Sequence, residues 1–223
     1  MEPGDETLML EHPINFVGNE TDDLHCFQAC IRMACQGLSG ESLSLEDADR
    51  MTGFEPGRQT WPFVGMLSLA EARYDVRSIE DFNPKHFITD PEAEIRRQAG
   101  DAEVGQHIIE VSDLGREVDL VARCLAHPNV TFESRPARLD DLEAAVALPG
   151  TAAICNVNYN ALADKPGYTG HFVLIESASR DGAMRIQNPG LPPIEDQEVS
   201  IDKFLAAWGY GSESMQNALI ISR

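Results

Sequence analysis

The order of two hydrophobic patterns along this chain constrains its fold more than any other feature. Helical spacing dominates as far as about residue 148, and its clearest example is the stripe of Cys26, Ala29, Cys30, Met33 and Ala34. After residue 150 come the short apolar runs TAAICNVNY, HFVLIESAS and AMRIQNP, separated by the turn-forming stretches DKPGYTG and RDG. IDKFLAAWG then indicates one more helix, and ALIIS a final strand. Helices followed by successive strands predict an α+β fold with a C-terminal antiparallel sheet.

Shorter segments of the first two-thirds refine this prediction. Acidic residues after Ser44 predict a short helix there, residues 63–74 have helical spacing, and YDVRSI indicates a strand. Pro91 suits the first turn of a helix, and the long helical pattern of 102–128 has a predicted break near Gly115. Residues 82–148 are therefore expected to be mostly helical.

Length and composition indicate a single domain that stays in the cytoplasm. The chain has 223 residues, 43% of them hydrophobic, which is ordinary for a globular domain. No run approaches the 18 or so apolar residues of a membrane span, and the start MEPGDETLMLEHP is acidic rather than basic and apolar like a secretory signal. Five cysteines, an odd number, fit reduced thiols better than a disulfide framework.

The charge balance excludes two classes of partner. Asp and Glu number 37 against 17 Lys and Arg, which gives a net charge of −20. A field of that sign repels phosphate backbones and anionic lipid, so we expect neither nucleic acid nor a membrane surface as partner. The acidity is explained either by adaptation to high salt or by an ordinary acidic cytosolic protein, whose genome favours arginine over lysine. The stretch GRQTWPFVG lacks the spacing and the lysine of a phosphate-binding loop.

Three residues have the contexts of a nucleophilic cysteine site. Cys26 is the first residue of its predicted helix, where unpaired N–H groups and the helix dipole lower a thiol pKa. His171 opens a predicted strand, and Asn188 follows seventeen residues later, after one hairpin. Adjacent strands can bring the imidazole and the amide together. A cysteine, a base and a group that orients the base are the parts of nucleophilic acyl transfer.

Two motifs resemble a known family. HCFQACIRMA resembles the segment that opens the catalytic helix in the peptidase C39-like branch of the papain-like cysteine peptidases, and GHFVLIESASRDGAMRIQNPG resembles its His and Asp/Asn segment. The ending IDKFLAAWGYGSESMQNALII is similar to that of the guanylyl cyclase domain-containing proteins. The resemblance covers roughly residues 19–80 and 150–223. It implies a papain-like fold over 1–223, with 85–145 as a helical insertion over the active-site cleft.

The resemblance also implies roles for individual residues. Cys26 would be the nucleophile, His171 the general base and acid, and Asn188 the residue that orients the imidazole. The family places a glutamine about six residues before the cysteine to donate to the oxyanion. Glu20 stands there and cannot donate as a carboxylate, but Asn19 beside it can, together with the backbone N–H of Cys26.

Each of these residues also has a plainer interpretation. Cys26 can be a small buried hydrophobe, His171 a hydrogen-bonded core histidine, and Asn188 a turn residue. Cys30 is expected to be core, or else a redox partner of Cys26. A zinc site of His25, Cys26 and Cys30 lacks the usual ligand spacing, so no metal is expected. The other thiols are expected to pack in the core: Cys35, Cys124 and Cys155.

The sequence therefore predicts cysteine-dependent acyl chemistry on a peptide or small-molecule acyl substrate, without a cofactor. The acceptor decides the type: water makes the protein a peptidase or amidase, and an amine makes it an acyltransferase. Gln28 and Trp61 are predicted to contact substrate, whereas His107 and His127 are expected to be ordinary surface residues. The alternative function is a catalytically silent papain-like domain used for binding.

Overall fold

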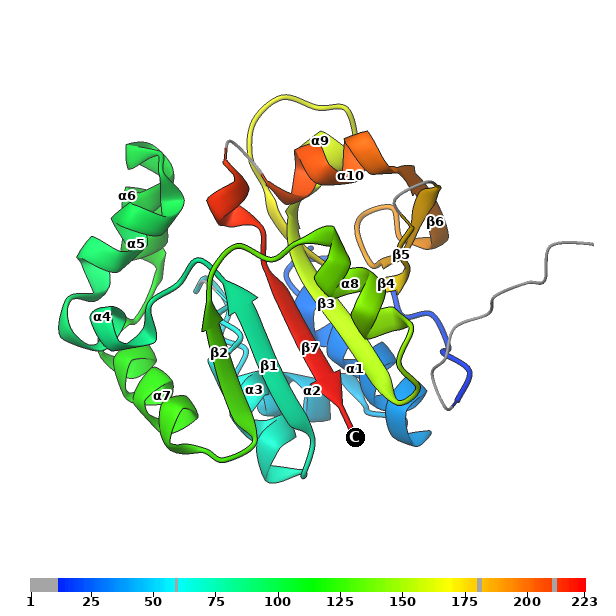
Figure 1. Cartoon of the computed structure of the whole chain (residues 1–223), viewed down its shortest axis with the longest axis horizontal. Coiled ribbons are helices and arrows are strands. Elements are labelled where there is room, and N and C mark those ends of the chain that lie inside the picture. The colour runs from blue at the N-terminus through cyan, green and yellow to red at the C-terminus, as the bar shows by residue number, and fades with distance from the viewer. Residues whose placement is uncertain (1–11, 59, 180–181, 210–211) are drawn as a thin grey trace, which may run out of the picture.

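The computed structural model of the chain describes residues 12–58, 60–179, 182–209 and 212–223. Two predicted features lie partly outside the described residues. They are the acidic N-terminal stretch on which the expected cytoplasmic location was based, at residues 1–11, and the RDG turn. The described part is a mixed sheet with helices on both faces (Figure 1), which confirms the α+β class. None of its helices is both long and apolar enough to cross a membrane.

The sheet has the strand order β2-β1-β7-β3-β4-β5-β6. All neighbours are antiparallel except β1 and β2, which run parallel. The strands are β1 Asp75–Glu80, β2 Val130–Ser134, β3 Thr151–Asn158, β4 Gly170–Ser177, β5 Ala183–Asn188, β6 Ile194–Ser200 and β7 Ala218–Ser222.

The helices lie in two layers. In Figure 1, α8, α9 and α10 lie in front of the sheet, and α1, α2 and α3 lie behind it. Their bounds are α1 Cys26–Ser39, α2 Leu45–Thr52, α3 Phe63–Glu71, α4 Pro84–Thr89, α5 Pro91–Ala99, α6 Ala102–Val111, α7 Leu114–Ala126, α8 Leu139–Val146, α9 Tyr159–Leu162 and α10 Ile201–Trp208, with a 3-10 turn η1 at Glu213–Met215.

Local signals explain most helix ends. The Ser44 side chain accepts from Asp47 N and caps α2 as predicted, and α5 begins on Pro91 behind the capping Asp90. The apolar stripe predicts that α1 ends near Gly37, and the helix ends two residues later at Ser39, where Gly40 takes a φ of 72°. The predicted break near Gly115 falls at the capping residue Asp113, which separates α6 from α7.

Two strands correct the sequence-based prediction. Residues 85–145 are not wholly helical, because β2 lies among them and pairs with β1 along Val76–Glu80. β1, from the N-terminal half, and β2 thus extend the sheet, which is neither purely antiparallel nor purely C-terminal. β6 was also missed: its central residues Glu195 to Glu198 are polar, since it is an edge strand with one buried position, Val199.

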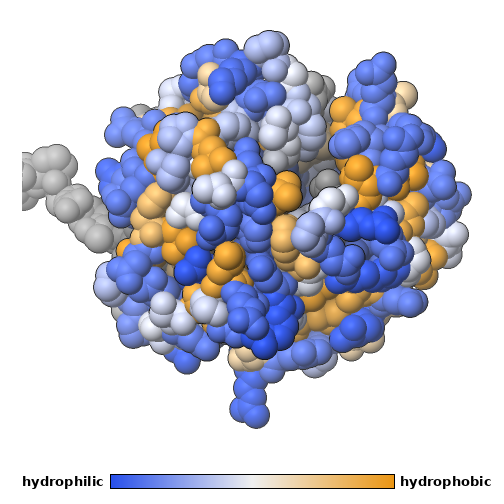
Figure 2. Space-filling view, turned by 180° about the vertical axis from the view of Figure 1, so that it is seen from behind, coloured by the Kyte–Doolittle hydropathy of each residue, from blue (hydrophilic) through white to orange (hydrophobic). Residues whose placement is uncertain are grey.

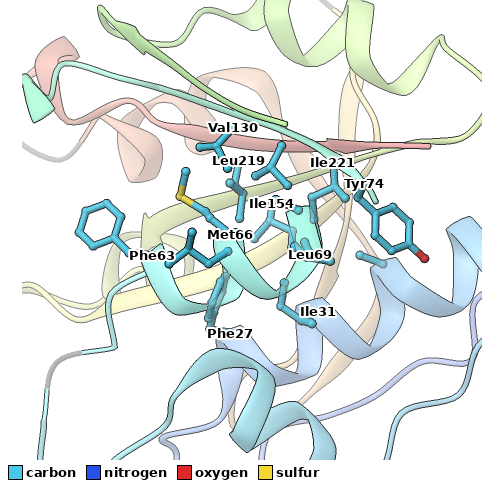
Figure 3. Close-up of a cluster of buried hydrophobic side chains, with 14 of the residues drawn as sticks. Phe27, Ile31, Phe63, Met66, Leu69, Tyr74, Val130, Ile154, Leu219 and Ile221 are labelled. Carbon is cyan, nitrogen blue, oxygen red and sulfur yellow. The ribbon is translucent and has the colours of Figure 1, made fainter. Parts of the chain in front are cut away.

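Alternation along the strands divides the core between the two faces of the sheet. Ile154 and Leu174 belong to a cluster with α1, α3 and α7. Figure 3 shows Ile154 of this cluster among Phe27, Met66 and Leu219. The other cluster packs α8, α9 and α10 on the opposite face. Four unpaired cysteines lie in these clusters, as expected of packing residues: Cys30, Cys35, Cys124 and Cys155.

Candidate functional site

Cys26 begins α1 and lies against the first residues of β4. The backbone N–H groups of Phe172 and Phe27 donate towards its sulfur. Phe172 can do so because its β3 partner, Asn156, has turned its own N–H and C=O to the Asn217 side chain, at 2.8 and 3.0 Å. Asn156 and Phe172 therefore form a non-hydrogen-bonded antiparallel pair, in which the N–H of Phe172 points away from β3 and towards the β5 side. The thiol therefore lies beside the first residues of β4, which precede the pairing of β4 with β5 at Leu174.

His171 of β4, the residue before Phe172, is hydrogen-bonded to Asn188 at the end of β5. Its Nε2 lies 2.8 Å from Asn188 Oδ1, and both side chains are buried. Asn188 Oδ1 also accepts from Gly190 N at 3.0 Å, while Asn188 Nδ2 donates to Gln197 Oε1 at 2.6 Å. These contacts fix the amide, so Nε2 of His171 must carry the proton. Nδ1 is then the basic nitrogen, with no hydrogen-bond partner among the described residues.

Burial sets the protonation of both reactive groups. It lowers the pKa of His171 to about 4, against the opposing effect of the Asn188 hydrogen bond. It raises the pKa of the Cys26 thiol to about 11, although the nearby N–H groups favour the thiolate. The prediction that the helix start lowers the thiol pKa is therefore wrong, because desolvation exceeds the effect of the N–H groups. Near neutral pH the structure holds a neutral thiol and a neutral imidazole, which make no hydrogen bond with each other.

A cavity of about 570 Å³ opens beside the Cys26 thiol. One wall comes from Gly170 and Phe172 of β4, and another from the α6 residues Glu103, Val104, His107 and Ile108. Figure 2, seen from behind, shows a hollow between the body of the molecule and the lobe of α5 and α6. His107 is exposed, as expected, but it also lines this cavity. The spacing of these four residues, i, i+1, i+4 and i+5, marks one face of α6, and this pattern is visible in the sequence.

Asn19 organises the loop in front of Cys26. Its Oδ1 accepts from the N–H groups of Glu20 and His25, at 3.0 and 2.7 Å, and its Nδ2 donates to Asp23 Oδ1 at 2.8 Å. Its backbone N–H donates to the carbonyl of Pro189, just beyond β5, at 2.7 Å. Asn19 thus ties this loop to the end of the strand that carries Asn188. One of its two amide hydrogens is used by Asp23, which itself lines the cavity.

Gln28 lies away from the cavity. It is fully buried, and its Nε2 donates to Thr52 Oγ1 at 2.8 Å, so the side chain packs α1 against α2. The predicted substrate contact has no support in this placement. Gln28 stands two positions from Cys26 on the helix, and residues so spaced do not share a face.

Trp61 lies next to the candidate site. It is half-buried, and its indole Nε1 donates to Ser112 Oγ at 2.9 Å. It lines a second cavity, of about 130 Å³, which we call the Trp61 cavity. This cavity shares wall residues with the Cys26 cavity: Thr60, Ile108, Asn156, Tyr168 and Phe172. Asn156, whose amide side chain is one of the polar groups in this shared wall, was not predicted to be a site residue.

His25, Cys26 and Cys30, the residues considered as zinc ligands, do not form a metal-binding arrangement in the part of the chain that the structure describes. Among the described residues, no group of three or more His, Cys, Asp or Glu side chains is arranged to hold a metal ion. His25, considered as a ligand with Cys26 and Cys30, instead contacts Asp22 Oδ1 through Nδ1 at 3.0 Å and packs on Phe54.

The structure thus brings Cys26, His171, Asn188 and Asn19 to one end of the sheet, with Trp61 beside them and Gln28 apart. Comparison of the sequence with models of known protein families finds no match, and comparison with curated proteins finds none either.

Proposed function

We propose that the protein carries out cysteine-dependent acyl transfer with Cys26, His171 and Asn188 in a papain-like arrangement. The observation that carries the proposal is the buried 2.8 Å contact between His171 Nε2 and Asn188 Oδ1, whose polarity is set by Gly190 and Gln197. It leaves an unprotonated Nδ1 on the residue next to the amide that contacts the thiol. The proposal requires a base that is held by a third group and can reach the nucleophile, and His171 directly precedes the residue whose amide contacts the Cys26 thiol.

The neutral resting pair implies general-base attack rather than a preformed thiolate. As the Cys26 sulfur bonds to a substrate carbonyl carbon, its proton passes to His171 Nδ1 and the carbonyl electrons move to oxygen. Collapse of this adduct expels the leaving group, which takes the proton from Nδ1. Water or an amine then attacks the thioester, with His171 again the base, and releases the acyl product and the free thiol. Asn188 keeps the ring in the reactive tautomer throughout.

Donors for the oxyanion are available next to the sulfur. The N–H of Cys26 lies at the start of α1, where helix N–H groups have no intrahelical acceptor. The second amide hydrogen of Asn19 is a further donor, as the family resemblance implies. α6 forms a wall of the cavity and would limit the size of the acyl group, which fits a peptide or small-molecule substrate rather than a folded protein.

The free thiols bear on where this chemistry would occur. All five cysteines are unpaired, which fits the reducing cytoplasm proposed from the sequence.

Acylation of the wild type by a small activated ester, followed by mass mapping of the modified residue, tests the proposal. We expect the acyl group on Cys26, no acylation in Cys26→Ala, and a fall of about 100-fold or more in the acylation rate of His171→Gln, the usual scale for a general base. His127→Gln is the matched control, because His127 lies outside both cavities. Asn188→Ala should fall between these variants, since the base remains but is no longer oriented.

The contrary result is equally definite. Uniform, slow acylation of all cysteines, unaffected by His171→Gln, would rule out the catalytic assignment and leave the silent binding domain.

A further inference from the structure

The Trp61 cavity has an acidic side chain in its wall. Trp61 and Phe172 provide aromatic walls, and Ser78, Glu80 and Gln98 provide polar ones. Glu80 ends β1 and keeps only part of its surface accessible. A volume of about 130 Å³ suits one side-chain-sized group, and the shared wall joins it to the cavity at Cys26.

Glu80 has no cationic partner among the described residues. Ser78 Oγ donates to Oε1 at 2.9 Å and Gln98 Nε2 donates to Oε2 at 3.1 Å. Both donors are neutral, and each carboxylate oxygen can accept a further hydrogen bond. Burial raises the pKa of Glu80 and the charges of Glu94 and Asp81 add to this effect, while both of those carboxylates are themselves paired with Arg97. A largely desolvated carboxylate in this position is costly until a cation reaches it.

The surroundings of the cavity favour a cation as well. The chain has a net charge of −20, which concentrates cations near its surface. The adjoining Cys26 cavity contains the carboxylates of Asp23 and Glu103, with Arg58 and His107 as its basic residues. The indole of Trp61, held by Ser112, is part of the cavity wall, and aromatic side chains attract ammonium and guanidinium groups.

We propose that the Trp61 cavity is a specificity subsite for a basic group, an ammonium or guanidinium carried on the substrate side chain, with Glu80 as its counter-ion. This proposal rests on the proposed function, since it names the class of substrate whose carbonyl Cys26 attacks. The substrate is then an acyl compound or peptide with a lysine-like or arginine-like side chain near the reacting carbonyl.

Binding of fragments tests the subsite without any cysteine chemistry. Calorimetric titration of the Cys26→Ala variant with butylguanidinium, and with its uncharged analogue butylurea, compares a cation with a neutral group of the same shape. We expect butylguanidinium to bind at least about tenfold more tightly, the lower end for a close charge pair. Equal affinity for the two fragments, or binding of neither, would overturn the subsite.

Variants then test whether Glu80 causes the preference for butylguanidinium over butylurea. Glu80→Gln should abolish the preference for butylguanidinium, and Glu110→Gln should retain it, because Glu110 is an exposed carboxylate of α6 outside both cavities. Thermal unfolding of both variants verifies that they fold. A preference that survives in folded Glu80→Gln would reject Glu80 as the counter-ion.

A reactivity measurement separates this proposal from the proposed function. Acyl-aminoacyl chloromethyl ketones with lysine or norleucine side chains are compared by their rate of modification of Cys26 in the wild type. Faster modification by the lysine compound, at a rate that depends on His171, supports both proposals. Equal, His171-dependent rates would reject the subsite alone, while modification independent of His171, together with selective fragment binding, would reject the catalytic assignment alone.

Discussion

Two carboxylates in the same region of the molecule, Glu94 and Glu80, have opposite surroundings. Glu94 is fully buried, and its oxygens accept from Asn83 N at 2.6 Å, His86 Nδ1 at 2.7 Å, and Arg97 at 2.7 and 3.1 Å. Although burial opposes ionisation, these donors lower the pKa of Glu94 to about 2. Glu80 has only neutral donors, and burial raises its pKa.

The difference distinguishes a carboxylate that is paired within the protein from one that is free to pair with a ligand. The partners of Glu94 come from α4 and α5, so the carboxylate fastens these helices together and has no free acceptor position. Glu80 faces a cavity, and in the part of the chain that the structure describes its hydrogen-bond donors, Ser78 and Gln98, are both neutral. A buried carboxylate is maintained by pairing in the first case, and in the second we attribute its presence to a ligand.

The largest expected effect comes from removing the structural carboxylate. Glu94→Ala should lower the free energy of unfolding at pH 7 by about 3 kcal/mol, because it leaves Asn83 N without its acceptor and Arg97 with Asp81 alone. The pKa of Glu94 is lowered, so its contribution is complete above the ordinary value of 4.5 and is lost as the pH falls towards 2. Denaturant unfolding between pH 2 and 7 measures both.

Glu92→Ala is the matched control for this loss. Glu92 lies two residues away in α5, is exposed and pairs with Arg96 at 3.3 Å. A loss of stability as large as that of Glu94→Ala would mean that the helix, and not the buried pairing, is responsible.

A smaller effect of opposite sign is expected at Glu80. Its pKa is raised, so the wild type loses folding stability as the pH rises above the ordinary value of 4.5. Glu80→Gln removes the ionisation and should therefore be as stable as the wild type or slightly more so at pH 7, within about 1 kcal/mol. Urea titrations at pH 4 and pH 7 measure the change. Marked destabilisation at pH 7 would show that Glu80 is a structural residue like Glu94.

The smallest effect is expected at an exposed ion pair. Lys203 Nζ lies 2.7 Å from Asp164 Oδ2, and the Asp164 side chain is 81% exposed. Lys203→Ala should change the free energy of unfolding by less than about 0.5 kcal/mol. This value sets the scale against which the Glu94 loss is compared, and a change above 1 kcal/mol would make the contrast between buried and exposed pairing untenable.

Local residue patterns accounted for most elements of the fold. Ser44, Pro91 and the apolar stripe after Cys26 act through contacts within a few residues, so their helices could be predicted. β2 could not, because a five-residue strand among helices is stabilised by its pairing with the distant β1. β6 pairs only with β5 at the edge of the sheet, and its polar side chains carry no alternating pattern.

The same division applies to the candidate site. The sequence by itself determined that Cys26 begins a helix and that His171 and Asn188 lie on successive strands, since both follow from local spacing. Only the tertiary structure decided that burial raises the Cys26 pKa, and that Glu80 lines a cavity with two neutral donors, Ser78 and Gln98, on its carboxylate. Desolvation and charge pairing depend on groups remote in the chain, which no local pattern specifies.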